Sequence, residues 1–372
     1  MKMKHQNVTR SLVLSSVVGA MVACGGGGGS SSSSSASVDQ AYAGPGSKWD
    51  VTLNTDNSFS ISRRDSVDTA VTLTVEGTYE RLTSGFVKLT VGSSVGDDGP
   101  SQGDTAWALE APGYAFFLNP IQDGSSQMIA MVTSGACPSS SLSANWVLVK
   151  KASDSSASST DSDFFGTFAF NDSTGVASLP EKRSLADTST NQGPEANIGS
   201  GSCSDGIMTI GSGADGGVMY LTANGGAIVH TNVDDEEDAS FIFALPQTSI
   251  TAVANLDGDF SGLLFDDSQS SGDEISPVAF SCASGTCTGN IVTNIDTGEL
   301  SVDEVTISLN GTPDAIDDGL ITATITSGSD TGVLACMADT DVLDSGSVMV
   351  SCVGQSPGDN AKMFNVMLVS KS

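Results

Sequence analysis

Most of this 372-residue chain consists of short runs in which apolar and polar residues alternate. The stretch KWDVTLNTDNSFSISRR, residues 48–64, is typical of a strand, a bend at residues 55–58 and a second strand. Runs such as AVTLTVEGTYERL, GFVKLTV and TAWALEA follow at similar spacing, with Gly, Asn, Asp and Ser between them. Alternation with period two places successive side chains on opposite faces of a strand, and helical periodicity is scarce. The pattern predicts an all-β protein with two or three antiparallel β-sandwich or β-barrel domains.

A low-complexity stretch divides this pattern. Residues 152–163, ASDSSASSTDSD, contain almost no apolar side chains and are typical of a linker or long loop. We therefore predict a first β-domain over residues 41–151, a second β-region over 164–253 and a third, acidic β-domain over 254–372. More than one core is expected, because about 330 folded residues exceed what a single hydrophobic core usually holds.

The first 24 residues differ from everything that follows. Lys2, Lys4 and Arg10 form a basic region before an apolar run, residues 11–23. This run is too short to span a bilayer as a mature helix. This arrangement indicates a secretory signal peptide over residues 1–23, which takes no part in the fold. Cys24 follows directly and begins a stretch of five glycines and six serines.

The residues Met21-Val22-Ala23-Cys24 resemble the lipobox of bacterial lipoproteins, with Met21 where leucine is usual. The resemblance implies cleavage before Cys24, which would then carry thioether-linked diacylglycerol and an amide-linked acyl chain such as palmitate. Two or three acyl chains anchor a protein stably, because each buried CH₂ contributes about 0.8 kcal/mol. The alternative is an ordinary cleaved signal peptide with an incidental free cysteine, which explains neither the position of Cys24 nor the stretch after it.

Residues 24–40 are predicted to act as a lipidated tether. The Gly/Ser-rich part has no side chains to bury, so it behaves as a flexible coil with an r.m.s. reach of about 20–24 Å. In lipoproteins of enteric bacteria an aspartate after the cysteine retains the protein in the inner membrane, and Gly25 occupies that place here. The resemblance therefore implies a cell-envelope protein of the outer membrane, and leaves open whether it faces the periplasm or the surface.

The chain is strongly acidic. Without residues 1–24 it has 11 basic residues against 44 acidic ones, and no Lys or Arg occurs between Arg183 and Lys362. Such a surface repels nucleic acid and anionic headgroups, and no basic patch compensates, so nucleic acid is excluded as a partner. The carboxylates are interpreted either as a solvated surface suited to a saline medium or as ligands of divalent cations.

Calcium is the cofactor that such carboxylates would hold, because it prefers hard oxygen ligands at alternating positions. The candidate ligands are Asn255, Asp257 and Asp259 in one segment, and Asp339, Asp341 and Asp344 in another. Both segments depart from the EF-hand pattern, since Phe260 and Asp344 stand where the sharp-turn glycine belongs. A denser acidic run, residues 234–238, is expected to stay solvated because its like charges repel one another.

Seven cysteines are present, and assigning Cys24 to lipid leaves six for an oxidising compartment. A four-residue turn, ASGT, would bring Cys282 and Cys287 face to face, and Cys336 and Cys352 each end an apolar run. Cys137 and Cys203 then pair by elimination. Thiol ligation of a metal is the weaker alternative, because no CxxC occurs and the mature chain has one histidine.

Trp49, Trp107 and Trp146 all fall in the first predicted β-domain. Such rings dominate β-sandwich cores, and they also form platforms for sugars or peptides, so we consider both packing and a ligand cleft. Catalytic motifs are weaker. Ser101 lies in a formal G-x-S-x-G match, but a loop enters a strand there instead of a strand entering a helix. His230 lies in the alternating run AIVHTN, which favours a strand side chain.

Glycine precedes an aromatic residue by two positions at Gly77-Thr78-Tyr79, Gly166-Thr167-Phe168 and Gly258-Asp259-Phe260. These openings, together with the glycine-rich lipidated tether, resemble the barrel modules of surface lipoproteins such as transferrin-binding proteins. The resemblance covers only these residues and the leader, so it implies related β-modules and assigns no functional residue.

Two functions follow from the sequence. The first is a membrane-anchored lipoprotein that serves as a non-enzymatic surface interaction or structural module, with an unknown protein or glycan as its partner. The second is a secreted-type hydrolase or carbohydrate-active enzyme that uses a carboxylate pair in an aromatic cleft within residues 41–151. The first is preferred because no spacing in the sequence selects a carboxylate pair.

Overall fold

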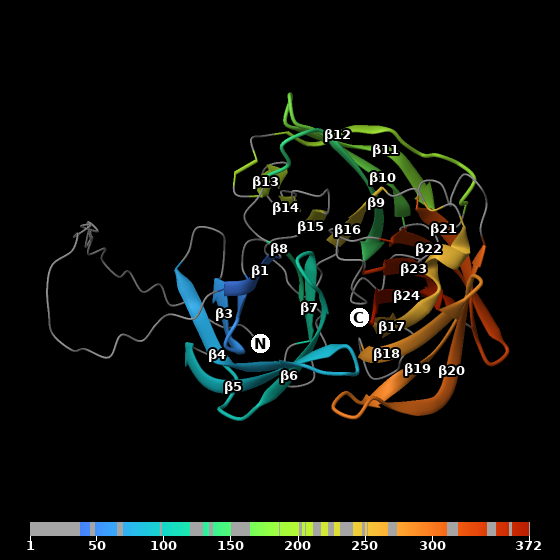
Figure 1. Cartoon of the computed structure of the whole chain (residues 1–372). Coiled ribbons are helices and arrows are strands. Elements are labelled where there is room, and N and C mark those ends of the chain that lie inside the picture. The colour runs from blue at the N-terminus through green and yellow to red at the C-terminus, as the bar shows by residue number, and fades with distance from the viewer. Residues whose placement is uncertain are drawn as a thin grey trace, which may run out of the picture. The chain divides into compact units, whose positions relative to one another are not determined.

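The architecture is described here from a computed structural model. It describes residues 38–44, 49–64, 70–96, 99–119, 129–133, 137–149, 164–185, 187–200, 203–204, 206–210, 217–221, 227–230, 241–247, 250, 252–266, 274–310, 319–340, 347–356 and 359–371. The predicted signal peptide, Cys24 and the linker at 152–163 lie outside these residues. Within them the strands form three antiparallel sheets, which confirms the all-β prediction (Figure 1).

The first sheet closes into a barrel, called the first barrel. Its strands are β1 (Val38–Gly44), β2 (Trp49–Asn54), β3 (Ser58–Arg64), β4 (Val71–Arg81), β5 (Phe86–Gly96), β6 (Thr105–Ala111), β7 (Ala115–Asn119) and β8 (Ile129–Thr133). Each strand pairs with its sequence neighbour, and β1 returns to β8 through Tyr42 opposite Thr133. The tether prediction extended to residue 40, but Val38 already begins β1.

The second sheet, called the middle sheet, has eight strands in the order β12-β11-β10-β9-β16-β15-β14-β13. They are β9 (Leu142–Val149), β10 (Phe164–Asn171), β11 (Val176–Ser184), β12 (Glu195–Ser200), β13 (Ile207–Ile210), β14 (Gly217–Leu221), β15 (Ala227–His230) and β16 (Phe241–Pro246). The first and last of these strands therefore lie side by side at its centre.

The third sheet closes into the last barrel. A 3₁₀ turn, η2 (Val253–Leu256), precedes its strands. They are β17 (Gly258–Asp266), β18 (Glu274–Ala283), β19 (Thr286–Asn294), β20 (Glu299–Asn310), β21 (Leu320–Ser327), β22 (Asp330–Asp339), β23 (Met349–Ser356) and β24 (Asp359–Ser370). Pairing of β17 with β24, for example Leu264 with Val366, closes this barrel.

The boundary between the first two sheets needs a correction. The first β-domain was predicted to run to residue 151, and so to include Trp146. In the structure Trp146 of β9 lies opposite Gly166 of β10 and Ala244 of β16, so this strand belongs to the middle sheet. Its apolar alternation would suit either sheet, because a strand's own pattern does not specify its partner strands.

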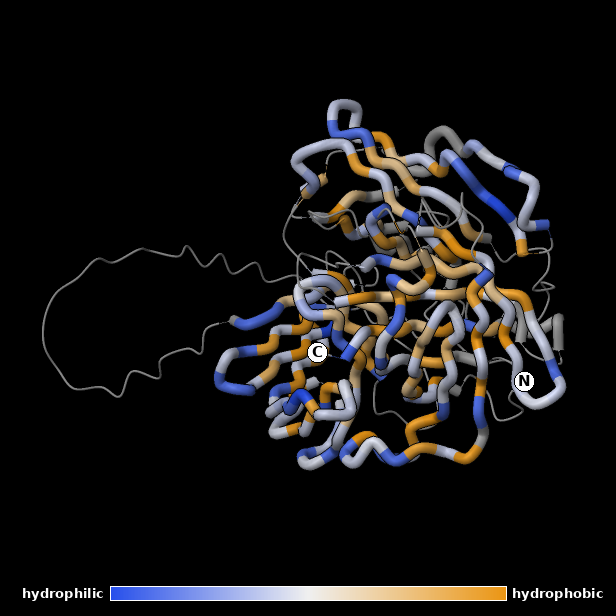
Figure 2. Tube along the Cα trace, turned by 45° about the vertical axis from the view of Figure 1, so that its right-hand side comes forward, coloured by the Kyte–Doolittle hydropathy of each residue, from blue (hydrophilic) through white to orange (hydrophobic). Residues whose placement is uncertain are grey.

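The alternating pattern fills each barrel. In the first barrel, Val51, Leu53, Phe59 and Ile61 belong to one buried cluster from facing strands. Phe260, Val278 and Ile307 belong to the corresponding cluster of the last barrel. Apolar and polar residues alternate along the strands, and hydrophilic residues occupy many of the turns (Figure 2). The interiors are therefore packed cores, as expected for barrels of this strand number.

A further apolar cluster joins the three sheets, and we call it the shared core. It contains Phe117 of the first barrel, Val147 and Phe243 of the middle sheet, and Met367 of the last barrel. The rings of Phe117 and Phe243 meet edge to face at 5.4 Å between centroids. The Tyr114 hydroxyl donates a hydrogen bond to the Ala244 carbonyl at 2.5 Å. Burial of apolar surface is the main force that holds sheets together, so this cluster couples them.

Polar contacts reinforce the junction of the two barrels. The hydroxyl of Ser84 donates to the Ile295 carbonyl at 2.6 Å, and the hydroxyl of Ser261 donates to the Ser84 carbonyl at 2.5 Å. Gly85 has a φ of +90°, and a Cβ there would lie 2.1 Å from the Ser261 hydroxyl oxygen. Only glycine fits this turn. None of the described residues forms a helix long and apolar enough to cross a membrane.

Candidate functional site

A pocket lies on the middle sheet, where the β10–β11 hairpin meets the start of β9. The hairpin turn is built locally: the Asn171 Oδ1 atom accepts the backbone N–H groups of Ser173 and Thr174, both at 3.1 Å. Gly175 completes the turn with a φ of +64°. Asparagine and glycine favour such turns, because the side chain bonds to nearby backbone and glycine adopts a positive φ without strain.

A side-chain contact ties this turn to β9. The Ser141 hydroxyl donates to the Asp172 carboxylate at 2.5 Å, and the Asp172 backbone N–H donates to the Ser141 oxygen at 3.2 Å. Ser141 immediately precedes β9, so the two contacts hold the tip of the hairpin beside the first residues of that strand. The position of the turn is therefore set by bonds at both of its ends.

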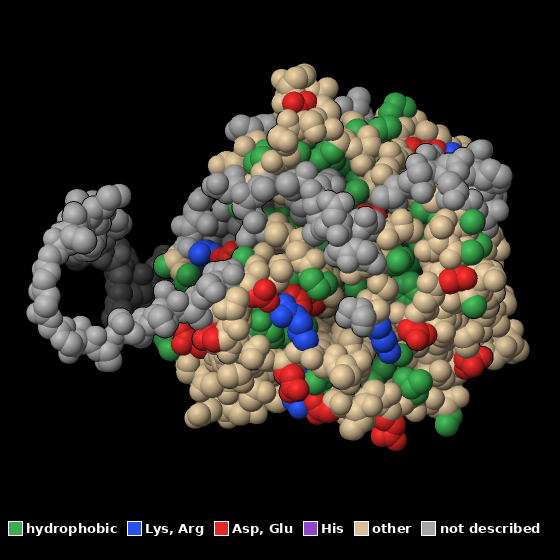
Figure 3. All heavy atoms as spheres, in the orientation of Figure 1, with side chains coloured by type: hydrophobic (Ala, Val, Ile, Leu, Met, Phe, Trp, Pro, Cys, Tyr) green, Lys and Arg blue, Asp and Glu red, His purple; other side chains and the backbone are tan. Residues whose placement is uncertain are grey.

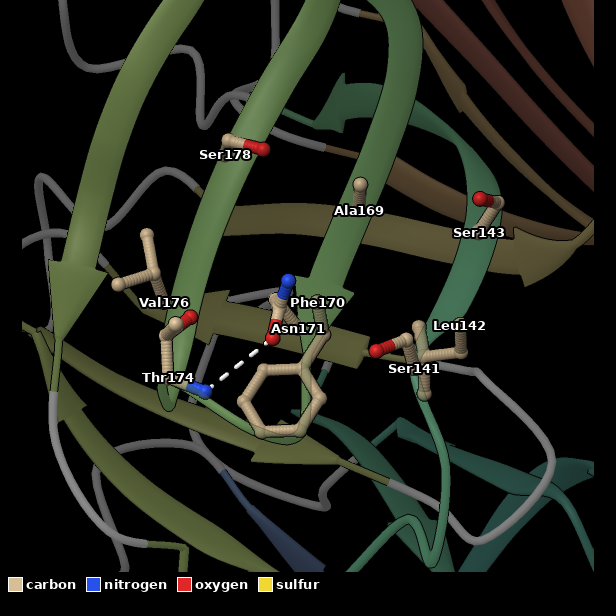
Figure 4. Close-up of a pocket in the computed structure, with 9 residues that line it drawn as sticks. All are labelled: Ser141, Leu142, Ser143, Ala169, Phe170, Asn171, Thr174, Val176 and Ser178. Atoms are coloured by element: carbon tan, nitrogen blue, oxygen red, sulfur yellow. Dashed lines mark hydrogen bonds between the residues drawn. The ribbon is translucent and has the colours of Figure 1, made fainter.

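The pocket is an open depression with a volume of about 480 Å³, which lies within the range usual for small-molecule sites. Its lining comprises Ser141, Leu142, Ser143, Ala169, Phe170, Asn171, Thr174, Val176 and Ser178. Figure 4 shows the Phe170 ring between Thr174 and Ser141, with Ser143 and Ser178 farther along their strands. The strand register places Ser143, Ala169 and Ser178 side by side on one face of the sheet, whereas Leu142 and Phe170 pack on the opposite face in the buried cluster of the middle sheet.

The polar groups of the lining are uncharged. Within the described part of the chain, the side-chain hydroxyls of Ser143, Thr174 and Ser178 make no hydrogen bond, and all three residues are at least partly exposed. Hydroxyl groups both donate and accept hydrogen bonds. The pocket is therefore equipped to recognise a neutral, polar molecule and carries no side chain that titrates near neutral pH.

The first barrel contains a charge network around a buried carboxylate, which sequence analysis did not find. Arg81 donates through Nε to Glu110 Oε2 at 2.6 Å and through Nη2 to Oε1 at 2.9 Å. The Tyr42 hydroxyl donates to the same carboxylate at 2.8 Å, and Arg81 also contacts Asp39 at 3.0 Å. The Glu110 side chain is 3 % exposed. Glu110 occupies a strand, TAWALEA, whose pattern gave no sign of a partner 29 residues away.

These contacts shift the pKa values of the groups involved. Burial, followed by the nearby Glu110 charge, raises the pKa of the Tyr42 hydroxyl well above its ordinary value. Hydrogen bonds to Glu110 are the main cause of a raised pKa for Arg81. The Glu110 carboxylate is thus engaged by residues of its own barrel.

On the face drawn in Figure 3, basic side chains lie beside acidic ones, and several acidic groups have no basic neighbour in view.

The structure does not bring the three tryptophans together. Trp49 packs at the edge of the first barrel's interior, beneath the Arg63 guanidinium at 5.8 Å from its ring centroid. Trp107 meets Phe86 edge to face at 5.6 Å beside the shared core. Trp146 is 1 % exposed in the cluster of the middle sheet. The predicted aromatic cleft would need these rings on one surface. Trp49 and Trp107 lie in the same barrel but pack against different clusters, and Trp146 lies in the middle sheet.

The predicted cation ligands have other partners or lie apart. The Asn255 Oδ1 atom accepts the Ala252 backbone N–H at 3.0 Å, and Asp257 Oδ1 accepts the Ser284 N–H at 2.7 Å. Asp259 is exposed, and Asp339 is 2 % exposed at the end of β22. Asp341, Asp344 and the acidic run 234–238 lie outside the described residues. Among the residues that are described, no three His, Cys, Asp or Glu side chains gather in a metal-binding group.

All three predicted disulfides are present. Cys282 pairs with Cys287 and Cys336 with Cys352, each between facing residues of neighbouring strands, and all four sulfurs belong to the interior of the last barrel. Cys137 pairs with Cys203 across a sequence separation of 66. Such bonds are usual in proteins of oxidising compartments.

The two catalytic candidates receive no support from their surroundings. Ser101 is exposed in a turn before β6, where its backbone N–H donates to Asp104 at 2.7 Å. No helix follows it, so the strand-to-helix elbow that activates such a serine is missing at this place. His230 ends β15, and its side chain lies outside the part that the structure describes.

No family model and no curated protein matches this chain. Among solved structures, transferrin binding protein B from Neisseria meningitidis shares 9 % identity at a TM-score of 0.28. A variant of transferrin binding protein B from Haemophilus parasuis shares 10 % at 0.30; in both cases the match covers 87 % of this chain and 65 % of the other. A protein with unknown function from Nostoc punctiforme shares 9 % at 0.23, covering 63 % of this chain and 96 % of that one.

This chain therefore spans about 65 % of the length of the transferrin binding proteins that it matches. At these identities and scores the comparisons define neither a site nor a partner. The class that the structure itself defines is an all-β, disulfide-bonded protein with two closed eight-stranded barrels.

Proposed function

We propose that this chain is a lipid-anchored protein of the bacterial cell envelope that acts as a non-enzymatic interaction module. The observation that carries the proposal is the pocket of about 480 Å³ on the middle sheet, whose lining offers hydroxyl, amide and apolar groups. The hydroxyl and amide groups suit recognition of a ligand, since specificity in small-molecule sites comes from a few placed polar groups.

The scaffold supports this role. The shared core couples all three sheets, and a disulfide joins the segment before β9 to the segment before β13 within the middle sheet. A binding surface gains affinity when its groups are held in place before the ligand arrives. The Ser141–Asp172 contact and the Asn171 turn hold the pocket rim in this way.

The anchor supports the location. Cys24 follows an apolar leader and begins the Gly/Ser-rich tether, so lipid on Cys24 would hold the sheets a short distance from a membrane. We place the protein at the outer membrane on the resemblance of its leader to bacterial lipoproteins and on Gly25. An unidentified protein or glycan of the envelope or its surroundings is the partner.

Substitution of the anchor tests the location. Cys24→Ala should abolish incorporation of labelled palmitate and move the chain from the membrane fraction to the soluble fraction. Cys137→Ala is a matched control, because it also removes a cysteine but leaves the leader intact. A Cys24→Ala chain that still incorporates palmitate contradicts the anchor.

Cross-linking in intact cells tests the interaction. A photoreactive amino acid at Thr174, on the pocket rim, should give a discrete cross-linked product. The same amino acid at Thr306, on the last barrel, is the control, since that position lies outside the pocket. Identical products from both positions, or none from Thr174, would count against an interaction through the pocket.

A further inference from the structure

The first barrel carries an arginine over an aromatic ring at each of its two ends. Trp49 begins β2 and Arg63 lies near the end of β3, so both lie at one end of the barrel. Tyr79 and Arg81 lie near the end of β4, at the opposite end. The Arg63 guanidinium lies 5.8 Å from the ring centroid of Trp49, and that of Arg81 lies 5.2 Å from the centroid of Tyr79.

The strand register places Trp49 and Arg63 at the mouth of the barrel. The two residues are paired across β2 and β3, and Arg63 is also paired with Leu73 of β4. Leu73 and Ile61 are buried in the interior cluster, and Trp49 packs against that cluster. Side chains alternate along a strand, so Arg63 lies on the same face as Ile61, two positions earlier. Both Trp49 and Arg63 are partly exposed, and solvent therefore reaches them at this end.

The two arginines differ in their charged partners. The three other arginines that follow the leader each pair with a carboxylate: Arg64 with Asp50, Arg81 with Glu110 and Asp39, and Arg183 with Glu181. Arg63 forms no ion pair within the part of the chain that the structure describes. After residue 24 the chain has 44 acidic residues and 11 basic ones. Despite this excess of carboxylates, the charge of Arg63 is available to an external group.

The contact with Trp49 prepares Arg63 to bind a carboxylate. A ring face attracts the cation but offers no oxygen acceptor, so the N–H donors of the guanidinium stay free. These donors match a carboxylate, which accepts two parallel hydrogen bonds from one arginine. The ring also restricts the arginine side chain before a ligand arrives, and this restriction lowers the entropic cost of binding.

The surroundings of Arg63 favour a protein over a lipid surface. Val71, at the same end of the barrel, is 45 % exposed. Tryptophan and arginine are the residues that most often dominate the binding energy of protein interfaces. Recognition of an anionic lipid surface instead takes a cluster of about four to eight basic residues, and the acidic chain as a whole repels such a surface.

The tether joins the barrel at the end away from Arg63. Val38 pairs with Asn54 at the turn between β2 and β3, whereas Gly44 pairs with Trp49. The seven residues of β1 separate these two ends by about 20 Å. The attachment of the tether therefore leaves the mouth at Trp49 accessible.

We infer that Trp49, Arg63 and Val71 form a contact site for an acidic side chain of a partner protein, and we call them the Arg63 site. A glutamate or aspartate carboxylate of the partner pairs with the Arg63 guanidinium, and an apolar neighbour of that residue covers Trp49 and Val71. This site goes beyond the proposed function, because it lies on the first barrel and does not involve the pocket of the middle sheet.

The test uses the full lipidated chain in an uncharged detergent and two blocked pentapeptides as probes. One peptide has a glutamate between two leucines at its centre, and the other has glutamine there, so the two differ only in charge. Titrations read by tryptophan fluorescence in a Trp107→Phe, Trp146→Phe background measure affinity, since Trp49 alone then reports. The glutamate peptide should bind about fivefold more tightly, which is the ratio that one exposed charge pair provides.

Three variants of the chain locate the site. Arg63→Ala should remove the difference between the two peptides, and Arg63→Lys, which keeps the charge but loses the planar fork, should restore part of it. Arg183→Ala is the matched control, because it removes the same charge from the middle sheet and should leave the ratio unchanged. Thermal melting verifies that each variant folds.

A photoreactive amino acid at Val71 tests the site in intact cells. It should give a cross-linked product that disappears in Arg63→Ala and persists in Arg183→Ala. A product that both variants retain would contradict a partner held by Arg63.

Three results of the titrations would overturn the inference. These are equal affinities of the two peptides for the unsubstituted arginine, equal effects of Arg63→Ala and Arg183→Ala, or tighter Arg63-dependent binding of glycerol phosphate, the headgroup of an anionic lipid, than of the glutamate peptide. Failure here is separable from failure of the proposed function. A chain that forms the Thr174 cross-link but shows no effect of Arg63→Ala keeps the pocket as its interaction site and refutes the Arg63 site.

Discussion

The two barrels have the same strand order and closure but different stabilising contacts. The first barrel contains no cysteine, and the buried Glu110 in its interior is bonded by Tyr42 and by the partly exposed Arg81. The last barrel, residues 258–370, has 17 acidic residues and one basic residue, Lys362, and its interior holds two disulfides. A segment with almost no cations cannot build ion pairs of its own. Covalent cross-links replace them, which shows that one topology accepts either means of stabilisation.

The largest expected effect concerns the charge network of the first barrel. Arg81→Ala should lower the free energy of unfolding by about 3 kcal/mol, because the buried Glu110 carboxylate loses two charge-assisted hydrogen bonds from an arginine that is itself partly exposed. Arg64→Ala is the control: its partner Asp50 has a side chain that is 45 % exposed, and loss of such a surface pair costs below about 1 kcal/mol. Denaturant unfolding in a Trp146→Phe background measures both, since Trp49 and Trp107 then report on the first barrel. Equal costs for the two variants would contradict the network around Glu110.

Removal of a disulfide should weaken the last barrel selectively. Cys336→Ala with Cys352→Ala opens a link over a sequence separation of 16, and loop closure predicts a loss of about 3 kcal/mol. Cys282→Ala with Cys287→Ala opens a separation of 5, which predicts about 2 kcal/mol. Hydrogen exchange should show lost protection concentrated in β18–β23. An equal loss in β1–β8 would mean that the shared core, and not the disulfides, sets the stability of this barrel.

Alkaline pH should destabilise the first barrel more than the last barrel, and this difference in stability should be smaller than the effects above. Burial raises the pKa of Tyr42 and of Tyr79 in the first barrel, and residues 258–370 contain no tyrosine. A raised folded-state pKa stabilises the barrel below the unfolded-state pKa of about 10, and that stability is lost as the pH rises through the folded-state value.

Tyr42→Phe should therefore flatten the loss of first-barrel stability above about pH 10. At pH 7 it should cost about 1.5 kcal/mol, because one hydrogen bond to the Glu110 carboxylate is lost. Unfolding curves between pH 7 and pH 11, read by tryptophan fluorescence, measure the slope. A Tyr42→Phe slope equal to that of the unsubstituted chain would show that Tyr42 does not titrate with unfolding.

Much of the fold was predictable because its signals are local. The run at residues 48–64 specified β2, a turn and β3, and the turn between Cys282 and Cys287 specified both a hairpin and a disulfide. Cys336 and Cys352 were predictable for a related reason, since each ends an apolar strand. The boundary at residue 151 was wrong, because β9 alternates in the same way whether it pairs with β8 or with β16.

The candidate site was less accessible to prediction. Ser141, Asn171 and Ser178 are ordinary turn and strand residues, and no motif relates them. Their proximity depends on the register that places Phe170 opposite Leu142. The same holds for Arg81 and Glu110, which lie on β4 and β6, the two neighbours of β5, and meet over that strand. Burial in a core, one of the two alternatives for the tryptophans, is correct for Trp146. The predicted cleft is wrong because each of the three rings belongs to a different cluster.

The sequence by itself determined the β class, the disulfide partners and the strongly acidic composition, since these follow from periodicity, spacing and counting. It also predicts the leader and the lipid on Cys24, which await the labelling experiment. Only the tertiary structure decided which strands share a sheet, that three sheets share one core, and that a neutral pocket lies on an acidic chain. The physical reason is that strand pairing and pocket formation depend on contacts between residues distant in sequence, and alternation within a single strand does not encode them.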